Sequence, residues 1–452
     1  MSSLRPPILK NSPKATFAAL AILVLSVPFI ATPISSAQTQ TDASPQASAD
    51  LARQIDDLQK QLTDLRKEMA AMKQSGSSSP APTVAAQAAV AQASGTPAAT
   101  PPPPPTLAGL LGPTALSGFV DVYYDYNSNQ PTSRASGFRS FDVNSNQFAL
   151  NLLELVVDKA PDPANSRTGY HVALGFGQAM NAVNGSDPGG LGFDQYLKEA
   201  YFSYLAPVGK GLQIDAGKFV TPHGAEVIET KDNWNYSRGL LFSYAIPYFH
   251  YGLRAKYAFN DKYWLSGSLV NGWNSVVDNN TGKTYGLGFG WNPTKRLSFT
   301  QNYMAGPEQG NNNSNWRQLS DTVVTYSPTS KLSFTANYDY GRGDRIAGVA
   351  HPVFWTGIAG YVRYAFNNNY AVATRYEYYD DHDGFTTSTA QHFNGFTETF
   401  QRMIAGHILG RFEFRRDISN QPTFVKGNGL PVTAQNTVTA GLVFMFDSRE
   451  AK

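Results

Sequence analysis

Apolar and polar residues alternate at every second position through most of the chain beyond residue 117. One face of the segment 332–340 consists of Leu332, Phe334, Ala336, Tyr338 and Tyr340. The opposite face of this segment carries only Ser, Thr, Asn and Asp, and the segment 438–446 repeats the alternation. Runs of about ten residues with one apolar face are typical of tilted strands that cross a membrane. Strands of a soluble β-sandwich alternate in the same way, so single strands do not separate the two fold classes.

The connections between the predicted strands do separate them. The predicted strand centres are residues 122, 152, 173, 200, 215, 254, 266, 287, 300, 322, 335, 360, 375, 397, 412 and 441. Short turns are expected at 207–210, 259–262, 292–295, 327–330, 366–369 and 405–407. Long polar loops are expected at 178–194, 220–247, 272–283, 305–316, 341–353, 380–395 and 417–435. Regular alternation of short turns with long loops is the pattern of outer-membrane barrels.

We therefore predict an all-β fold, a transmembrane antiparallel β-barrel of about 16 strands with both termini on the periplasmic side. The strand pattern is weakest within 391–416, where alternation is loose. Helix is expected in the barrel region only as a short piece within 224–245.

The region before the barrel divides into three segments. Residues 1–37 have the pattern of a secretory signal peptide, because basic residues precede the apolar run 17–30 and small residues follow at 35–37. A membrane anchor is the alternative, but that run is shorter than the ~20 residues that a spanning helix needs. Residues 75–106 are rich in Ala and Pro and predict an extended linker. The barrel domain is assigned to residues 107–452.

Residues 38–74 predict a short coiled-coil helix in the periplasm. Its heptad seam consists of Leu51, Ile55, Leu58, Leu62, Leu65, Met69 and Met72. Steps of four and three residues keep one apolar stripe facing a partner helix. Self-association is expected, with a homotrimer as the predicted oligomer. The alternative is a single amphipathic helix that packs against the barrel rim.

Composition narrows the function. The chain has 452 residues, a formal charge of +2 and no Cys. The lack of Cys excludes disulfides, Cys-ligated metals and thiol catalysis, and the low net charge gives no reason to expect nucleic-acid binding. Aromatic residues make up 13% of the chain, although mean hydropathy is −0.31. Strands that hide half of their side chains in a water-filled lumen explain both values.

Charged residues at the polar positions of the strands are expected to line a pore, because a Lys or Arg facing lipid near the midplane costs about 2–4 kcal/mol. The predicted pore-lining residues of the strands are Asp121, Asp125, Glu154, Asp158, Asp215, Arg254, Lys256, Arg363, Arg375, Arg411 and Arg415. Glu377 and Glu413 accompany them. Acids gather on the N-terminal strands and bases on the C-terminal strands. They could form a transverse field across an aqueous channel, or ladders that rigidify the wall.

The longest predicted loop, 220–246, is expected to fold into the lumen and form a constriction. Its apolar half, 240–246, needs burial. Its polar half is expected to project into the channel with Glu226, Glu229, Lys231, Asp232 and Arg238. The alternative position of the loop is an extracellular cap.

This loop lies in the stretch 217–254, GKFVTPHGAEVIETKDNWNYSRGLLFSYAIPYFHYGLR. Together with SGFVDVYYDYN (117–127), NQFALNLLELVVDKAP (146–161) and LKEAYFSYLAP (197–207), the stretch resembles the β-barrel porin family with OmpL-like members. The resemblance covers residues 115–446. It implies an outer-membrane diffusion channel and names no solute.

Motifs for catalysis or cofactors are absent from the sequence. The seven His residues show no HExxH spacing, and no GxSxG motif occurs. The segment 380–384 could gather Ca²⁺, although a solvated loop tip is the simpler interpretation. No cofactor and no metal are therefore expected. The expected partners are outer-membrane lipid, copies of the same chain and small hydrophilic solutes, with no nucleic acid.

We predict a passive outer-membrane porin and no enzyme. One alternative is a structural tether, in which the linker contacts peptidoglycan. The other is a hydrolase built into the barrel.

Overall fold

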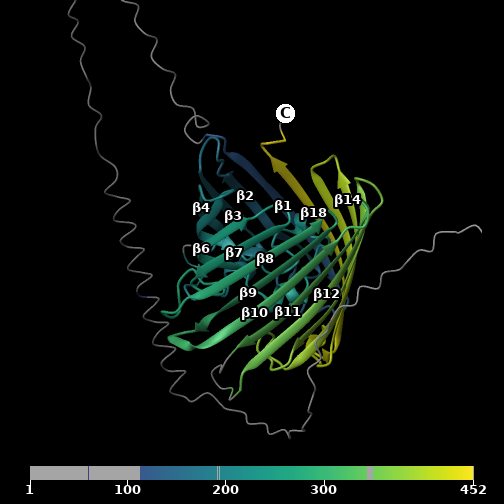
Figure 1. Cartoon of the computed structure of the whole chain (residues 1–452). Coiled ribbons are helices and arrows are strands. Elements are labelled where there is room, and N and C mark those ends of the chain that lie inside the picture. The colour runs from purple at the N-terminus through teal and green to yellow at the C-terminus, as the bar shows by residue number, and fades with distance from the viewer. Residues whose placement is uncertain are drawn as a thin grey trace, which may run out of the picture. The chain divides into compact units, whose positions relative to one another are not determined.

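Sixteen long strands pair in chain order and close into one barrel (Figure 1). The computed structural model describes residues 60, 112–190, 192, 194–343, 349 and 351–450. The strands of the barrel are β1 (Ala115–Asn127), β2 (Gln147–Lys159), β3 (Thr168–Phe176), β4 (Leu197–Ala206), β5 (Leu212–Val220), β6 (Phe249–Ala258), β7 (Tyr263–Val270), β8 (Thr284–Thr294), β9 (Leu297–Gln309), β10 (Asn312–Tyr326), β11 (Leu332–Gly343), β12 (Val353–Ala365), β13 (Tyr370–Asp381), β14 (Gln391–Ile404), β15 (Ile408–Ser419) and β18 (Ala434–Asp447). All neighbours are antiparallel, and β1 pairs with β18 from Ser117–Asp447 to Asn127–Thr437. The predicted 16-strand barrel is confirmed.

Side chains alternate between the lumen and the outer face as the sequence predicts. On β18, Leu442 and Phe444 are about half exposed on the outer face, whereas Val443 between them is buried. On β8, the outward residues are Tyr285, Leu287, Phe289 and Trp291. Apolar outward residues suit a barrel surrounded by lipid.

The segment 391–416, where the strand pattern is weakest, forms β14 and the greater part of β15. Loose alternation on β14 has a visible cause. Glu398 lies on the outward face of β14, where an apolar residue would be expected. It accepts a hydrogen bond at 2.5 Å from the hydroxyl of Thr374, which lies on the outward face of neighbouring β13.

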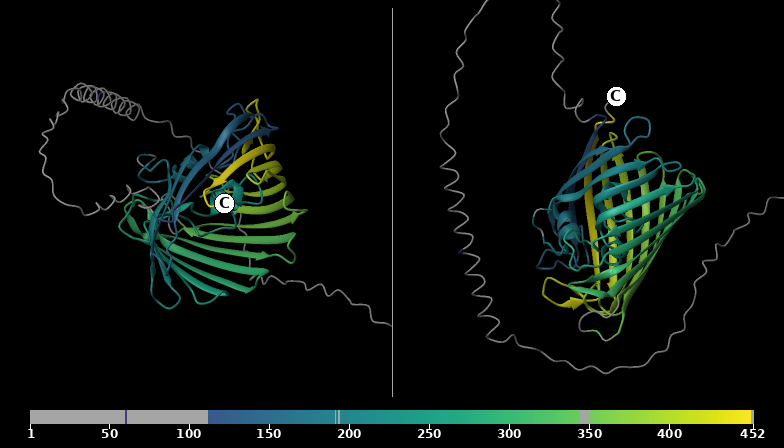
Figure 2. Two further views of the ribbon diagram at one scale, coloured as in Figure 1. Left: turned by 90° about the horizontal axis from the view of Figure 1, so that it is seen from above. Right: turned by 60° about the vertical axis from the view of Figure 1, so that its left-hand side comes forward.

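The two ends of the barrel differ (Figure 2). Short turns join the strands at the end that carries the C-terminus, and the small hairpin of β16 (Phe424–Val425) and β17 (Pro431–Val432) lies at the other end. Two predictions about the connections are wrong. The expected loop 305–316 is instead the tip of a hairpin, because β9 and β10 extend to leave only residues 310–311 between them. The loop 178–194 contains a helix that was not predicted, α3 (Gln178–Asn184).

Helix α3 is too short for a periodic signal to stand out in the sequence. Its apolar side chains Ala179, Met180 and Val183 are nevertheless fully buried, and this packing explains why the segment is helical. Within the described residues, no helix is long and apolar enough to cross a membrane. The predicted signal peptide, coiled coil and linker lie outside the described residues, apart from Lys60.

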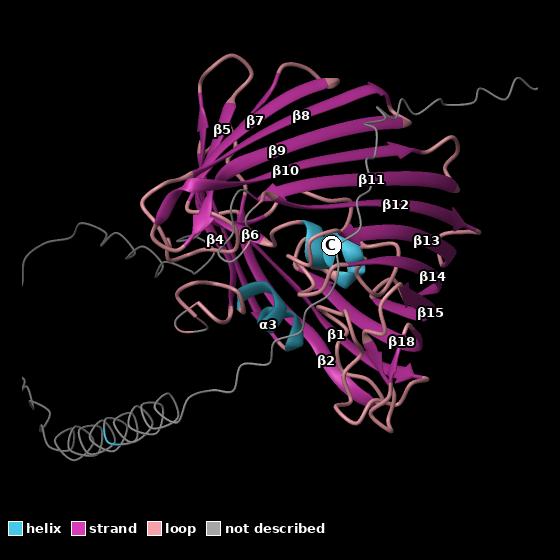
Figure 3. Ribbon diagram, turned by 90° about the horizontal axis from the view of Figure 1, so that it is seen from below, coloured by secondary structure: helices cyan, strands magenta, loops and turns pink. Residues whose placement is uncertain are grey.

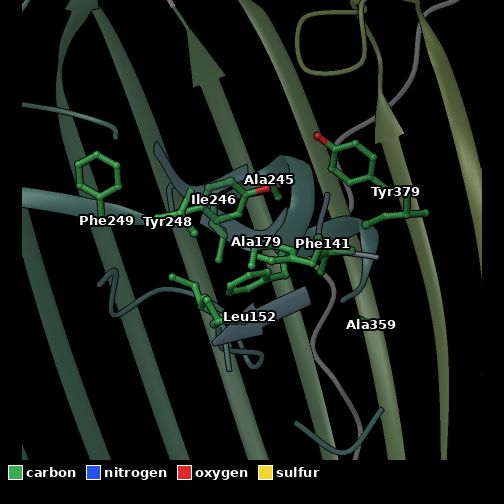
Figure 4. Packing of buried hydrophobic residues seen from close by; sticks show 14 of the residues in the cluster. Phe141, Leu152, Ala179, Ala245, Ile246, Tyr248, Phe249, Ala359 and Tyr379 are labelled. Carbon is green, nitrogen blue, oxygen red and sulfur yellow. The ribbon is translucent and has the colours of Figure 1, made fainter. Parts of the chain in front are cut away.

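The main apolar cluster lies within the long loops and the adjoining strands (Figure 4). It joins Phe141 of the first loop, Leu152 of β2, Ala179 of α3 and the segment 240–249. Segments far apart in sequence therefore share one core, which fixes the loops relative to the wall.

Candidate channel constriction

The loop between β5 and β6, residues 221–248, folds into the barrel. Its two helical pieces are η1 (Thr230–Asp232) and η2 (Leu241–Ala245). In the view along the barrel, these helical turns lie inside the ring of strands (Figure 3). Side chains of many strands bond to the loop, among them β1, β2, β4, β6, β9, β11, β12, β13, β14 and β15. We call this segment the constriction loop.

Arg375 on β13 anchors the constriction loop. Its guanidinium lies 2.7 Å from the Glu226 carboxylate and donates to the Ser237 carbonyl at 2.6 Å. Glu377, two residues along the same face, accepts the backbone N–H of Leu240 and lies 3.2 Å from Arg375. Arg375 and Glu377 are fully buried, so these charges are held in a low-dielectric site where bonds between them are strong.

Strand β15, which lies beyond β14 in the barrel, supplies three further anchors. Arg411 donates to the carbonyls of Thr230 and Asn235, and Arg415 donates to the Arg238 carbonyl at 2.6 Å. Glu413, between them, accepts the N–H groups of Tyr236 and Ser237 at 2.6 and 3.0 Å. Loop backbone groups that would otherwise be unpaired in the lumen are thus satisfied by wall side chains.

The acids of the first strands bind the loop from the other side. Asp121 on β1 accepts the hydroxyl protons of Thr230 at 2.6 Å and Tyr236 at 2.8 Å. Lys198 on β4 bridges Glu154 on β2 and Glu229 of the loop. Each of these carboxylates is therefore paired.

Small residues on the wall make room for the loop. A Cβ on Gly441 of β18 would lie 2.3 Å from the ring of Tyr236, and one on Gly357 of β12 would lie 2.8 Å from Leu241. The apolar half packs as predicted, with Leu240, Leu241 and Phe242 nearly inaccessible to solvent.

The polar half of the loop differs from the expectation. Glu226 and Arg238 were expected to project into the channel, but both are buried. Arg238 donates to the carbonyls of Ile228 and Tyr236 and stacks on Phe141, 4.7 Å from the ring centroid. Arg238 is buried because backbone carbonyls accept its hydrogen bonds, and Glu226 is buried because Arg375 of the wall pairs with it. Lys231 and Asp232 remain partly or largely accessible and pair with each other at 2.6 Å.

The pore-lining residues predicted on the strands fall into two groups. Most are buried and bonded: Asp121, Asp125, Glu154, Asp215, Arg375, Arg411 and Arg415. Asp158 pairs with His171 and remains partly accessible. Arg254 is partly accessible and pairs with Asp215 at 2.8 Å, whereas Lys256 and Arg363 have no carboxylate partner among the described residues. Most of these charges therefore bond to the loop or to other wall residues. Few of them remain accessible to form a transverse field across the lumen.

The first loop, residues 128–146, was missed by the sequence interpretation. Its Phe141 ring packs against Phe242 and Tyr248 of the constriction loop, with centroids 5.7 and 5.4 Å apart. Its Arg139 lies 3.5 Å from Asp417 on β15. The segment RSFD (139–142) was the available signal in the sequence. A large aromatic residue between charged residues indicates a loop that packs against the protein, because a fully solvated loop gains nothing from a Phe side chain.

Space remains on the side of the lumen formed by β5 to β9. A cavity of about 350 Å³ lies there, between the constriction loop at Pro222 and His223 and the inner wall. The inward positions of β8 are Gly286, Gly288 and Gly290, which carry no side chain. On β7 the inward residues Ser266 and Ser268 are also small. The cavity thus lies between the loop and the small inward residues of β7 and β8.

The segment 380–384, considered as a Ca²⁺ loop, uses its carboxylate internally. Asp381 accepts the backbone N–H groups of Phe385, Thr386 and Thr387. The described residues contain no group of three or more His, Cys, Asp or Glu side chains placed to hold a metal.

Comparisons with known proteins agree with this architecture. Residues 113–446 match the family described as "Putative beta-barrel porin-2, OmpL-like". The anion-selective porin from Comamonas acidovorans superimposes with a TM-score of 0.50 at 9% identity, over 74% of this chain and 99% of that chain. The outer-membrane channel DcaP of Acinetobacter baumannii superimposes with a TM-score of 0.48 at 12% identity, over 74% of this chain and 97% of that chain. No curated protein sequence matches the chain.

Proposed function

Because the chain belongs to the β-barrel porin-2 family with OmpL-like members, we propose that this outer-membrane porin passes small hydrophilic solutes by passive diffusion. The passage runs between the constriction loop and the inner faces of β5 to β9. The observation that carries the proposal is the anchoring of the loop by buried charges on one side while Gly and Ser line the other.

A large barrel with an anchored loop suits selection by size. Sixteen strands enclose an aqueous channel, whereas about eight would be filled by side chains. Anchors on many strands of the barrel keep the loop fixed, so the cross-section does not depend on a bound ligand. Arg254 and Lys256 are the proposed charged lining of this passage, and Glu229, Lys231, Asp232 and Arg363 are proposed as charges on other parts of the lumen.

Conductance of the purified full-length protein in a planar bilayer tests this function. Ohmic single-channel steps in KCl are expected, together with swelling of proteoliposomes in small sugars that falls off with sugar size. A properly folded barrel that gives no conductance would contradict the proposal. It would favour the structural tether, in which the linker contacts peptidoglycan.

We also propose that the protein assembles as a homotrimer, with the periplasmic helix 38–74 and the barrel wall as contacts. Glu398 supports a contact at the wall, because a carboxylate on the outward face is less costly against protein than against lipid. Deletion of 47–74 is expected to lower the temperature at which the oligomer dissociates on a mild-detergent gel. The matched deletion of linker residues 78–100 should leave it unchanged. Equal melting of the wild type and the 47–74 deletion would remove the helix from the assembly.

A further inference from the structure

Two solvent-accessible cations at inward strand positions near one end of the barrel have no carboxylate partner in the described part of the chain: Lys256 on β6 and Arg363 on β12. Each lies two residues before the end of its strand, next to the short turns 259–262 and 366–369. Their strands are six places apart in the order of the barrel. The two cations therefore flank the same mouth of the lumen from different walls.

Lys256 belongs to the cavity along β5 to β9. Its ammonium lies 4.3 Å from the centroid of the Trp264 ring, which holds the side chain by a cation–π contact without neutralising it. Arg254, two residues away on the same face, stacks on Phe219 and Tyr201 at 4.4 and 4.9 Å. Aromatic faces thus position both cations beside the passage.

The carboxylate that lines the cavity and the accessible acids of the loop have partners of their own. Asp215 is the acid that lines the cavity, and it accepts from Arg254 at 2.8 Å and from the Ser203 hydroxyl at 2.6 Å. Among the loop acids, Glu229 pairs with Lys198 and Asp232 pairs with Lys231. Asp158, on another wall, pairs with His171.

We propose that the channel prefers anions and that Lys256 and Arg363 set this preference, so that its solutes are small organic anions such as carboxylates. This inference rests on the proposed diffusion function. Arg254 and Asp215 cancel each other at close range, which leaves Lys256 as the net charge of the cavity. In a narrow aqueous passage with low-dielectric walls, one uncompensated charge raises the local concentration of counter-ions. The Ser266 and Ser268 hydroxyls offer hydrogen bonds to a passing carboxylate.

The test is the reversal potential of the full-length protein in a tenfold gradient of KCl and then of potassium acetate. For the wild type, the sign of the reversal potential is expected to show that the anion is more permeant than K⁺ in both salts. Lys256→Gln and Arg363→Gln should each lower the permeability ratio of anion to K⁺ severalfold, and the double variant should lower it further. Lys256→Arg, which keeps the charge, should retain the wild-type ratio. Arg416→Gln removes a cation from the outward face of β15 and should also leave the ratio unchanged.

The outcomes separate this inference from the diffusion function. A conducting wild type that prefers cations overturns the anion preference and leaves the porin function intact. Unchanged ratios in both Gln variants, with wild-type conductance and heat-modifiability on gels, overturn the assignment to Lys256 and Arg363. Chloride preference without acetate passage overturns the solute class. Absence of any conductance overturns the diffusion function itself.

Discussion

The guanidinium of Arg375 on β13 lies 2.7 Å from the carboxylate of Glu226, and both side chains are buried inside the barrel. The pair spans 149 residues of sequence and joins the wall to the constriction loop. A buried ion pair contributes little net stability, but removal of one partner leaves a buried charge uncompensated. The pair therefore acts as a latch that holds the loop in one place.

Arg375→Met should loosen this latch. Loss of one partner of a buried pair costs about 3–5 kcal/mol, and the lower end is expected because lumen water reaches Glu226 once the loop detaches. Urea unfolding in detergent micelles measures the free energy of unfolding, and single-channel records should show added open-state noise.

The double variant Arg375→Met/Glu226→Gln separates the latch from simple packing. It should recover part of the lost stability, because position 226 no longer carries a buried carboxylate without its arginine. Arg449→Gln, which breaks an exposed pair with Asp447, serves as the control and should change neither stability nor noise. Strictly additive losses in the double variant would show that the two side chains do not act as a pair.

Gly441→Val should displace the loop at its opposite edge. A Cβ at this position would lie 2.3 Å from the Tyr236 ring, so the ring must move away from Asp121, to which its hydroxyl donates. Lower thermal stability and a larger, noisier conductance are expected. Gly410→Val on β15 is the matched control, since a Cβ there meets Leu442 at an ordinary 3.6 Å. Equal behaviour of the two variants would contradict the packing of Tyr236 against β18.

Ser268→Tyr should narrow the passage along β7. The residue lines the cavity, and a phenol ring there occupies volume next to Gly286, where no side chain stands. Conductance is expected to fall, with the stability of the barrel unchanged. Leu269→Tyr, on the outward face of the same strand, should leave conductance as in the wild type. A Ser268→Tyr channel of full conductance would place the passage elsewhere in the lumen.

The alternation of residues was sufficient to predict the barrel. The predicted strand centres all fall within observed strands, because the period of two reports directly which face meets lipid. Hairpin tips were harder to predict. The polar residues at 305–316 are typical of a loop, yet β9 and β10 pair as far as Asn312 and Gln309, with a register shift between Asn312 and Trp316. Polar side chains do not oppose strand pairing where water surrounds the hairpin.

The site was predictable in place but not in detail. The length and apolar half of the constriction loop indicated that it folds inward. The burial and pairing of its charged residues could not be predicted, because Arg375, Arg411 and Arg415 bond to loop residues that are 138 to 181 positions away in the sequence. The alternation shows that a side chain points into the lumen. It does not show whether that side chain contacts water or the constriction loop. Helix α3 and the first loop were missed for the same reason, since their burial depends on contacts far along the chain.

Single-channel conductance of a variant lacking residues 224–240 tests the central claim most directly, because this segment carries the anchors to Arg375, Arg411 and Asp121. The deletion removes the part of the loop that makes these contacts with the wall. In a barrel that remains heat-modifiable on gels, a severalfold increase in conductance over the wild type is predicted. Wild-type conductance in such a folded variant would contradict the account, because it would mean that the loop does not limit the passage.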